Sequence, residues 1–135
     1  MEWQVDIMIN GLEHVGLCAQ NPERLVDWYT TVLRCQVVHR IDERSTYFVR
    51  FPGGGMLEVY PATDQSVPVG NLHSGLRHLA ISVDDFESDC EYMVGHGAIL
   101  IPEMTVRNGE MKLAFFKDPE GNLIHLVQRF GAVCF

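Results

Sequence analysis

The chain has 135 residues, 47% of them apolar, which is enough for one folded domain with a single core but short for two. Its formal net charge of −8 argues against a broad nucleic-acid-binding surface, because duplex affinity rests largely on Lys and Arg that neutralise phosphates. Residues 1–6 lack the basic flank of a signal peptide, no apolar stretch is long enough to span a membrane and the four cysteines are scattered, so we expect a cytoplasmic protein.

The sequence contains an internal repeat. The segment Gly11-Leu12-Glu13-His14-Val15-Gly16-Leu17 is matched 64 residues later by Gly75-Leu76-Arg77-His78-Leu79-Ala80-Ile81. Both segments are typical of strands, and each carries a histidine at the same place. Repeated segments of this kind indicate repeated structural units, so we expect two equivalent modules.

In the first half, a helix is predicted from about residue 22 to 33. Asn21 can cap it, Pro22 suits its first position, and its apolar residues recur at spacings of three and four, which is typical of a helix with one buried face: Leu25, Trp28, Tyr29 and Val32. Three strands are predicted after it, at residues 35–40, 45–51 and 56–60. The glycine run at 53–55 joins two strands and leads into no helix, so we do not expect it to bind phosphate.

The second half repeats this order after a linker at about residues 62–74. Asp84 or Asp85 can cap a helix that ends near residue 94 and that buries Phe86, Cys90 and either Met93 or Val94. Strands follow at 98–101, 112–117 and 123–128. Each half therefore has the order βαβββ. We predict a single α+β domain over residues 1–135, built from modules at about 9–61 and 75–129 and followed by a tail at 130–135.

Four ionisable side chains occupy related positions in the two modules. His14 and His78 match on the first strands, whereas Glu58 and His125 are each the only ionisable group in an apolar last strand. Glu58 follows His14 by 44 residues and His125 follows His78 by 47, a difference that a longer hairpin loop near Asn108 explains. A lone histidine on an apolar strand is more often a hydrogen-bonded core residue, and a lone Glu58 would more often be solvated. Pseudo-twofold packing of the modules would instead bring all four to one cavity, where three imidazoles and a carboxylate suit Zn, Fe(II), Ni, Co or Mn better than Mg or Ca.

Other reactive residues have no partner in the repeat. We expect surface positions for the remaining histidines, which are His39, His73 and His96. Cys18 and Cys90 are predicted to be buried thiols that act as small apolar residues rather than as metal ligands. No combination of Ser or Cys with His indicates a nucleophilic triad.

These segments together resemble the vicinal oxygen chelate superfamily, which includes glyoxalase I, extradiol dioxygenases, methylmalonyl-CoA epimerase and the fosfomycin and bleomycin resistance proteins. The resemblance covers about residues 9–129 and is most specific at 12–17, 28–33 and 115–124. It implies tandem βαβββ modules that form a cupped mixed sheet around a central cavity, a divalent metal ion that binds substrate through neighbouring oxygens, and a homodimer. The usual ligand positions fall on His14, Glu58, His78 and His125. His125 departs from the pattern, because the common residue at that position is glutamate.

Three functions remain open on this basis, all with a small-molecule ligand. In a glyoxalase-type lyase or isomerase, the metal would stabilise an enediolate while Glu58, as ligand and base, moves the proton. In an extradiol-type Fe(II) dioxygenase, His14, His78 and Glu58 would bind the iron beside an aromatic pocket that could include Tyr47, Phe48, Phe115 and Phe116. A protein that only binds a drug or metabolite, as bleomycin resistance proteins do, would carry out no chemistry. The sequence does not reveal whether glutathione is used, and the apolar tail is predicted to cover the cup or a partner subunit.

Overall fold

The computed structural model describes residues 8–135, so the prediction about residues 1–6 lies outside the described part. The first module comprises β1 (Val15–Ala19), α1 (Pro22–Thr31), β2 (Gln36–Ile41), β3 (Thr46–Arg50) and β4 (Met56–Pro61). The second comprises β5 (His78–Ser82), α2 (Phe86–Gly95), β6 (Ile99–Arg107), β7 (Met111–Lys117) and β8 (Leu123–Arg129). Short 3-10 turns, η1 (Asp42–Arg44) and η2 (Gly131–Val133), precede β3 and follow β8. The predicted α+β fold with two tandem βαβββ modules is confirmed.

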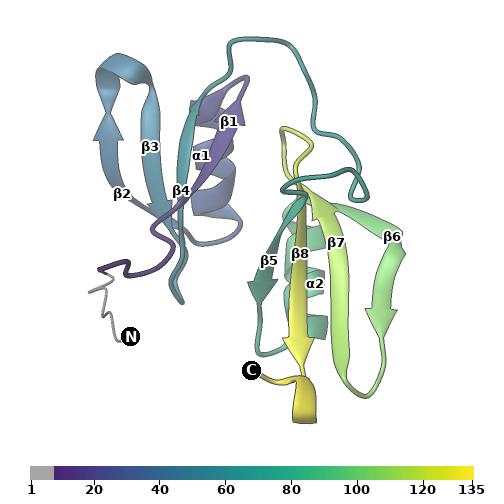
Figure 1. Ribbon diagram of the computed structural model, residues 1–135. Helices are drawn as coiled ribbons and strands as arrows, with labels where there is room; N and C mark the ends of the chain where they lie inside the picture. The colour runs from purple at the N-terminus through teal and green to yellow at the C-terminus, as the bar shows by residue number, and fades with distance from the viewer. Residues whose placement is uncertain (1–7) are drawn as a thin grey trace.

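The two modules have the same sheet topology. The strand orders are β1-β4-β3-β2 and β5-β8-β7-β6, and in each sheet the first strand pairs in parallel with the last while the other pairs are antiparallel. Figure 1 views both sheets with their helices behind them. Each sheet therefore has one face covered by its own helix and one helix-free face, and the parallel pairing sets the first strand of each module directly beside its last.

Local sequence determines where the helices begin. Asn21 accepts a hydrogen bond from the Arg24 amide at 3.1 Å, and Asp85, which is 64 residues later, accepts one from the Ser88 amide at 3.2 Å. Both side chains satisfy a backbone N–H group that the first helical turn leaves free. The predicted apolar stripes are buried in the helices: Leu25, Tyr29 and Val32 in and after α1, and Phe86 and Met93 in α2. Val94, the alternative to Met93, is 51% exposed.

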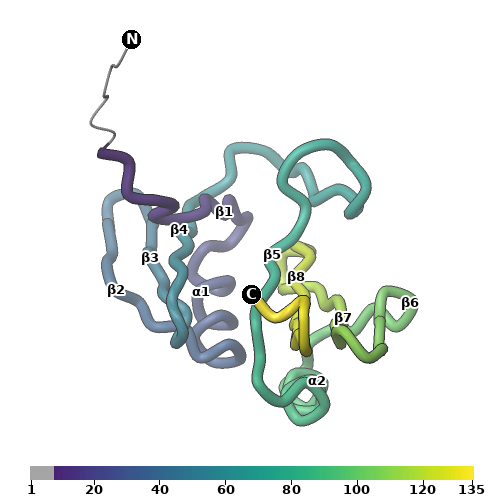
Figure 2. The backbone as a smooth tube through the Cα atoms, turned by 60° about the horizontal axis from the view of Figure 1, so that its bottom comes forward, coloured from purple at the N-terminus to yellow at the C-terminus, as the bar shows by residue number. Residues whose placement is uncertain are grey.

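Helix α1 lies between the two sheets (Figure 2) and joins the modules into one packed unit. One side of it packs on the first sheet through Leu25 and Tyr29, whereas Val32 belongs to the core of the second module. The buried Tyr29 hydroxyl donates a hydrogen bond of 2.9 Å to Asp118, and the Glu120 carboxylate accepts a hydrogen bond of 2.7 Å from the backbone N–H of Gln20. Polar contacts across the junction therefore supplement the shared apolar core.

Several element boundaries differ from the prediction. Strand β1 begins at Val15 rather than at residue 11, because the preceding residues pair with no neighbouring strand and Leu12 is 85% exposed. Strand β6 continues to Arg107, six residues beyond the predicted end. Its pairing with β7 is irregular between Ile101 and Thr105, and this irregularity includes Pro102, which cannot donate to a ladder. Within residues 8–135, no helix is long and apolar enough to cross a membrane.

Candidate metal site

The first pair of predicted ligands lies on the helix-free face of the first sheet. His14 directly precedes β1, Glu58 lies in β4, and the register places Gly16 opposite Glu58. The Nε2 atom of His14 is 3.5 Å from Oε1 of Glu58, with 33% and 28% of the two side chains exposed. The absence of a side chain at Gly16 leaves room above this part of β1, and the Tyr60 ring occupies part of that room.

The second pair occupies the matching place on the second sheet. His78 is the first residue of β5, and His125 lies in the middle of β8 opposite Ala80. The two imidazole rings are 4.7 Å apart between centroids, with an angle of 35° between their planes. His78 is exposed, whereas His125 is only 7% exposed.

Strand register establishes that Glu58 and His125 are equivalent positions. Glu58 is opposite Phe48 in the first sheet, and His125 is opposite Phe115 in the second. Each phenylalanine also meets the first histidine of its module edge to face, with centroid distances of 5.6 Å for His14 and 5.2 Å for His78. The repeat therefore extends to a three-residue cluster of histidine, phenylalanine and last-strand ligand in each module. Only the last-strand residue differs in chemical type.

His125 is an unusual core residue. Both of its ring nitrogens are buried, and neither has a hydrogen-bond partner within the described chain. Burial lowers the pKa of His125 to about 4, with smaller contributions from His78 and Arg129, so the ring is neutral at pH 7. A buried polar group without a partner costs about 1–3 kcal/mol. A neutral imidazole with a free lone pair is also the form that binds metal ions, so His125 fits a ligand role.

The half-buried His14 and the exposed His78 are each held through Nδ1. In His14 this atom is 2.8 Å from Oε1 of Glu13, and in His78 it is 2.8 Å from Oδ1 of Asn71. Carboxylate and amide oxygens only accept hydrogen bonds, so in the neutral rings Nδ1 carries the proton and Nε2 keeps its lone pair. Neither Glu13 nor Asn71 was predicted. Glu13 is adjacent to a predicted ligand in sequence, but Asn71 lies in the linker and no pattern marks it.

The facing side chains of His14 and Glu58 have a separation that suits a cation bound between them. In the neutral His14 ring, Nε2 and the Glu58 carboxylate are both acceptors, and two acceptors at 3.5 Å attract each other only when a proton or a cation lies between them. Metal–ligand bonds of roughly 2.1 Å at tetrahedral angles set donor atoms about 3.4 Å apart. Imidazole nitrogens with a carboxylate oxygen suit Zn and the first-row transition metals. The residues present therefore fit a divalent metal.

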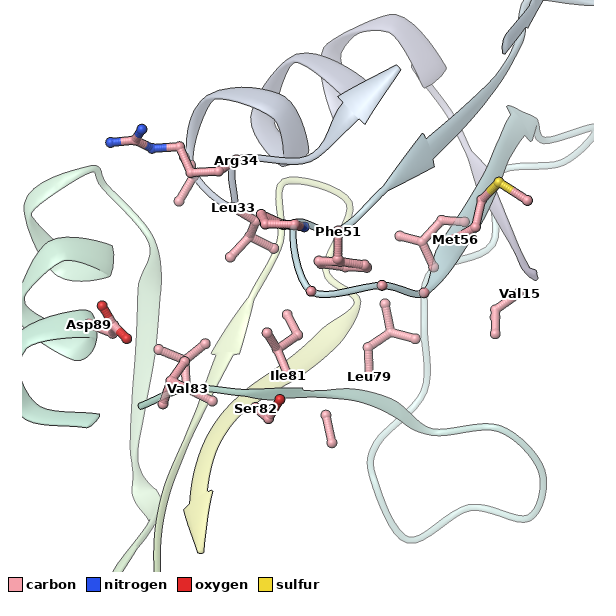
Figure 3. Close-up of a pocket in the computed structure, with 18 of the residues that line it drawn as sticks. Val15, Leu33, Arg34, Phe51, Met56, Leu79, Ile81, Ser82, Val83 and Asp89 are labelled. Atoms are coloured by element: carbon pink, nitrogen blue, oxygen red, sulfur yellow. The ribbon is translucent and has the colours of Figure 1, made fainter. Parts of the chain in front are cut away.

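The four predicted ligands form two pairs within the chain rather than one cluster. Among residues 8–135, no three His, Cys, Asp or Glu side chains come close enough to hold one metal ion. A cavity of about 480 Å³ lies between the modules (Figure 3), but its lining is mainly apolar and includes only His14 of the four. Leu33 and Phe51 from the first module face Leu79 and Ile81 of β5 across it. The two pairs lie instead on the helix-free faces.

The remaining predicted positions have mixed outcomes. His39, His73 and His96 are exposed, as predicted. Cys18 is exposed, so its prediction as a buried thiol is wrong: it shares the helix-free face of β1 with Gly16, whereas the next residue, Ala19, belongs to the core beneath α1. Cys90 is half-buried in α2, as its place in the apolar stripe implied. Of the four aromatic residues suggested for a pocket, Phe48 and Phe115 meet the site histidines, whereas Tyr47 and Phe116 pack in the two cores.

The chain matches known proteins over most of its length. The sequence profile described as the glyoxalase/bleomycin resistance protein/dioxygenase superfamily matches residues 11–126. A lactoylglutathione lyase of Neisseria meningitidis serogroup A is 28% identical over 127 residues, which cover 87% of this chain and 90% of that protein. The metallothiol transferase FosB of Shouchella clausii is 24% identical over 123 residues, with coverage of 88% and 80%.

Solved structures share the fold. A glyoxylase/bleomycin resistance protein/dioxygenase domain from Frankia sp. EAN1pec superposes with a TM-score of 0.74 at 21% identity, and the match covers 92% of this chain and 95% of that one. The fosfomycin resistance protein FosX from Listeria monocytogenes, in a complex with Mn(II) and 1S,2S-dihydroxypropylphosphonic acid, has a TM-score of 0.74 at 16% identity, with coverage of 93% and 95%.

Proposed function

Because the chain belongs to the glyoxalase/bleomycin resistance protein/dioxygenase superfamily, we propose that it is a divalent-metal-dependent enzyme of the glyoxalase type. Its reaction would be that of a lyase or isomerase on a small substrate with neighbouring oxygens. The observation that carries this proposal is the equivalent pair of ligand-type side chains on each helix-free face, His14 with Glu58 and His78 with His125. The four free cysteines suit a reducing cytoplasm as its location.

The active form would be a homodimer in which each metal site combines two chains. Each helix-free face carries only half of the ligand set, and a second copy can bring His14 and Glu58 of one chain to His78 and His125 of the other. Leu12 and Leu76 support this arrangement: they occupy matching positions two residues before each histidine and are 85% and 84% exposed. Such large exposed apolar side chains beside incomplete sites are typical of surfaces that a partner covers.

Mixing two inactive variants tests the shared site. His14→Ala and His78→Ala would each break both sites of their own homodimer, but a mixed dimer would keep one complete site. After unfolding and refolding together, an equal mixture should regain about a quarter of the wild-type activity, because half of the dimers are mixed and each has one of two sites intact. Sedimentation analysis should give a dimer. No recovery of activity in the refolded mixture, or a monomer with full activity, would refute the shared site.

Within this site, Glu58 would be both ligand and base. A bound divalent metal would polarise a substrate carbonyl and stabilise the negative charge that develops beside it. Glu58 is the only carboxylate among the four ligand positions, so it is the group that would take a proton from the carbon next to that carbonyl and return it. His125, neutral at pH 7, would supply a nitrogen ligand, and Phe48 and Phe115 would keep water away from the histidines.

Replacement of Glu58 by glutamine tests this assignment. Metal-free protein would be loaded in turn with Zn, Ni, Co and Mn and assayed on hemithioacetals of α-ketoaldehydes. We expect Glu58→Gln to lower kcat by about 100-fold or more while Zn still binds, because the amide oxygen can act as a ligand but cannot accept the proton. Glu43→Gln, at an exposed carboxylate in η1, is the control and should leave kcat unchanged. Full activity of Glu58→Gln would overturn the role of Glu58.

The combination of ligand-type side chains also supports a second reaction, that of an extradiol dioxygenase. His14, His78 and Glu58 make up a set of two histidines and one carboxylate, which is typical of Fe(II) oxygenases, and an aromatic ring lies against each histidine. Oxygen uptake by Fe(II)-loaded protein with a catechol would favour an extradiol dioxygenase over the lyase. If none of these metals binds, as judged by elemental analysis and thermal shift, the protein acts instead by binding a small molecule.

A further inference from the structure

The first histidine of each module, His14 or His78, makes the same contact through Nδ1 but with a partner at a different place in the module. In the first module, the acceptor for His14 is Glu13, the preceding residue. The repeat places Arg77 at the corresponding position in the second module, and arginine has no acceptor. Asn71, seven residues before His78, supplies the acceptor there at the same 2.8 Å distance. The contact to Nδ1 is thus present in both modules, although the second module has Arg77 at the position of Glu13.

The segment that carries Asn71 is folded back onto the start of β5. The His73 amide donates to the Gly70 carbonyl at 3.3 Å, which forms a tight turn around Asn71 and Leu72. Arg77 reaches the same Gly70 carbonyl at 3.5 Å, the weak limit of a hydrogen bond. Leu72 in this turn is 97% exposed, so burial of its side chain does not hold the turn in place. The polar contacts that tie the turn to the start of β5 are therefore the hydrogen bond between His78 and Asn71 and the weaker contact of Arg77.

We infer that Glu13 and Asn71 are positioning residues that hold His14 and His78 in the Nδ1-protonated form, with Nε2 free to bind the metal. The inference rests on the proposed metal site. It assigns a functional role to the linker between the modules, which the repeat alone leaves without one. Partners of this kind fix the tautomer and the ring orientation of a ligand histidine, and their loss typically lowers metal affinity by about 10–100-fold.

The first test needs no metal. Side-chain ¹⁵N NMR of metal-free protein reports which ring nitrogen of each histidine carries the proton. We expect His78 to be protonated on Nδ1 in the wild-type protein and in Asn71→Asp, which keeps an acceptor oxygen. In Asn71→Ala, the proton should move to Nε2, the form that unrestrained histidine favours. Leu72→Ala, in the same turn, is the matched control and should leave the His78 signals unchanged. An unaltered His78 tautomer in Asn71→Ala would overturn the inference.

The second test measures Zn²⁺ affinity by competition with a chelator. Asn71→Ala should raise the Kd for Zn²⁺ by about ten-fold or more, whereas Asn71→Asp should stay near the wild-type value. Glu13→Ala and Glu13→Gln should behave in the same way at His14. If Asn71→Asp loses as much affinity as Asn71→Ala, the amide acts by some means other than its acceptor oxygen and the inference is wrong. If Zn²⁺ does not bind to the wild-type protein, the proposed function fails, while the tautomer measurement still decides the positioning role.

Discussion

Replacement of His125 by leucine should stabilise the metal-free protein and disrupt the proposed metal site. The two buried ring nitrogens have no partner, and removal of such a group recovers about 1–3 kcal/mol. Leucine fills a similar volume but loses the ring contacts to Phe115 and His78, which are worth about 0.5–1.5 kcal/mol. The free energy of unfolding should therefore rise by about 1 kcal/mol, which corresponds to an increase in Tm of roughly 3–5 °C for a domain of this size.

Zinc should make the wild-type protein more stable than His125→Leu, the reverse of the order without metal. A ligand that binds only the folded state stabilises it by about 2.7 kcal/mol at a concentration of 100 times its Kd. The wild-type protein should gain this stability, whereas His125→Leu should gain much less because it has lost one ligand. Differential scanning fluorimetry with EDTA and with Zn²⁺ would measure both effects. His73→Leu, at an exposed histidine outside both pairs, is the control and should shift Tm little in either buffer.

Two results would refute this reasoning. A fall in the Tm of the metal-free protein by several degrees would mean that the imidazole of His125 contributes to the core through contacts that leucine does not replace. An equal Zn²⁺-induced shift in wild type and His125→Leu would mean that His125 is not a ligand. The diagnostic result is therefore a reversal: His125→Leu is more stable than wild type without metal, and wild type is more stable with Zn²⁺. Neither a purely structural role of His125 nor a general destabilisation by the substitution produces this reversal.

The other predictions concern the contact of Tyr29 with Asp118 at the junction between the modules, and Gly16 opposite Glu58 in the first module. Tyr29→Phe removes the 2.9 Å hydrogen bond to the buried Asp118 and should lower the free energy of unfolding in urea by about 1.5–3 kcal/mol. Burial raises the pKa of Asp118 in the folded state. The stability that this carboxyl group contributes is therefore fully present below its pKa in the unfolded chain, and it is lost as the pH rises through the higher pKa of the folded state. In urea titrations across this pH range, the free energy of unfolding of Asp118→Asn should therefore increase relative to that of wild type as the pH rises. A Cβ atom at the exposed Gly16 would lie 3.2 Å from the outer end of the half-buried Tyr60 ring, which can move by a few tenths of an ångström. Gly16→Ala should therefore change the free energy of unfolding by less than about 1 kcal/mol, and a double-mutant cycle with Tyr60→Ala should assign that change to this contact.

Much of the fold could be predicted because the repeat links local signals to long-range ones. Asn21 and Asp85 begin equivalent helices, and the histidine strands open equivalent modules, so each half supports the interpretation of the other. The failures occurred where the repeat gives no information. The irregularity of β6 around Pro102 interrupts the alternation of apolar residues, and this hid the second part of the strand. The exposure of Cys18 depends on which face of β1 the helix covers, and the residue pattern of the strand did not determine that face.

The pairing of the candidate residues within each module followed from the sequence, but the arrangement of the two pairs did not. Sequence spacing indicated that Glu58 and His125 are equivalent, and the strand register confirms that they occupy the same position in the two sheets. Nothing in the residue pattern indicated that the two pairs lie on separate helix-free faces, because two modules can satisfy pseudo-twofold symmetry within one chain or between two chains. The packing of Val32 and Leu79 decides this point, since each contributes to the core of the other module and so fixes α1 between the sheets. Asn71 was unpredictable because the linker has no periodic pattern.

The difference between Glu58 and His125 has a consequence for the substrate. In the proposed site, one carboxylate and three neutral imidazoles would leave a bound divalent cation with a net charge of about +1, whereas the second glutamate of the usual pattern would neutralise it. A residual positive charge in a partly buried site strengthens binding of anionic oxygens, because few water molecules screen the attraction. If the proposed site is correct, histidine at position 125 in place of glutamate would favour substrates that bind as anions and would leave Glu58 as the one carboxylate able to carry the proton.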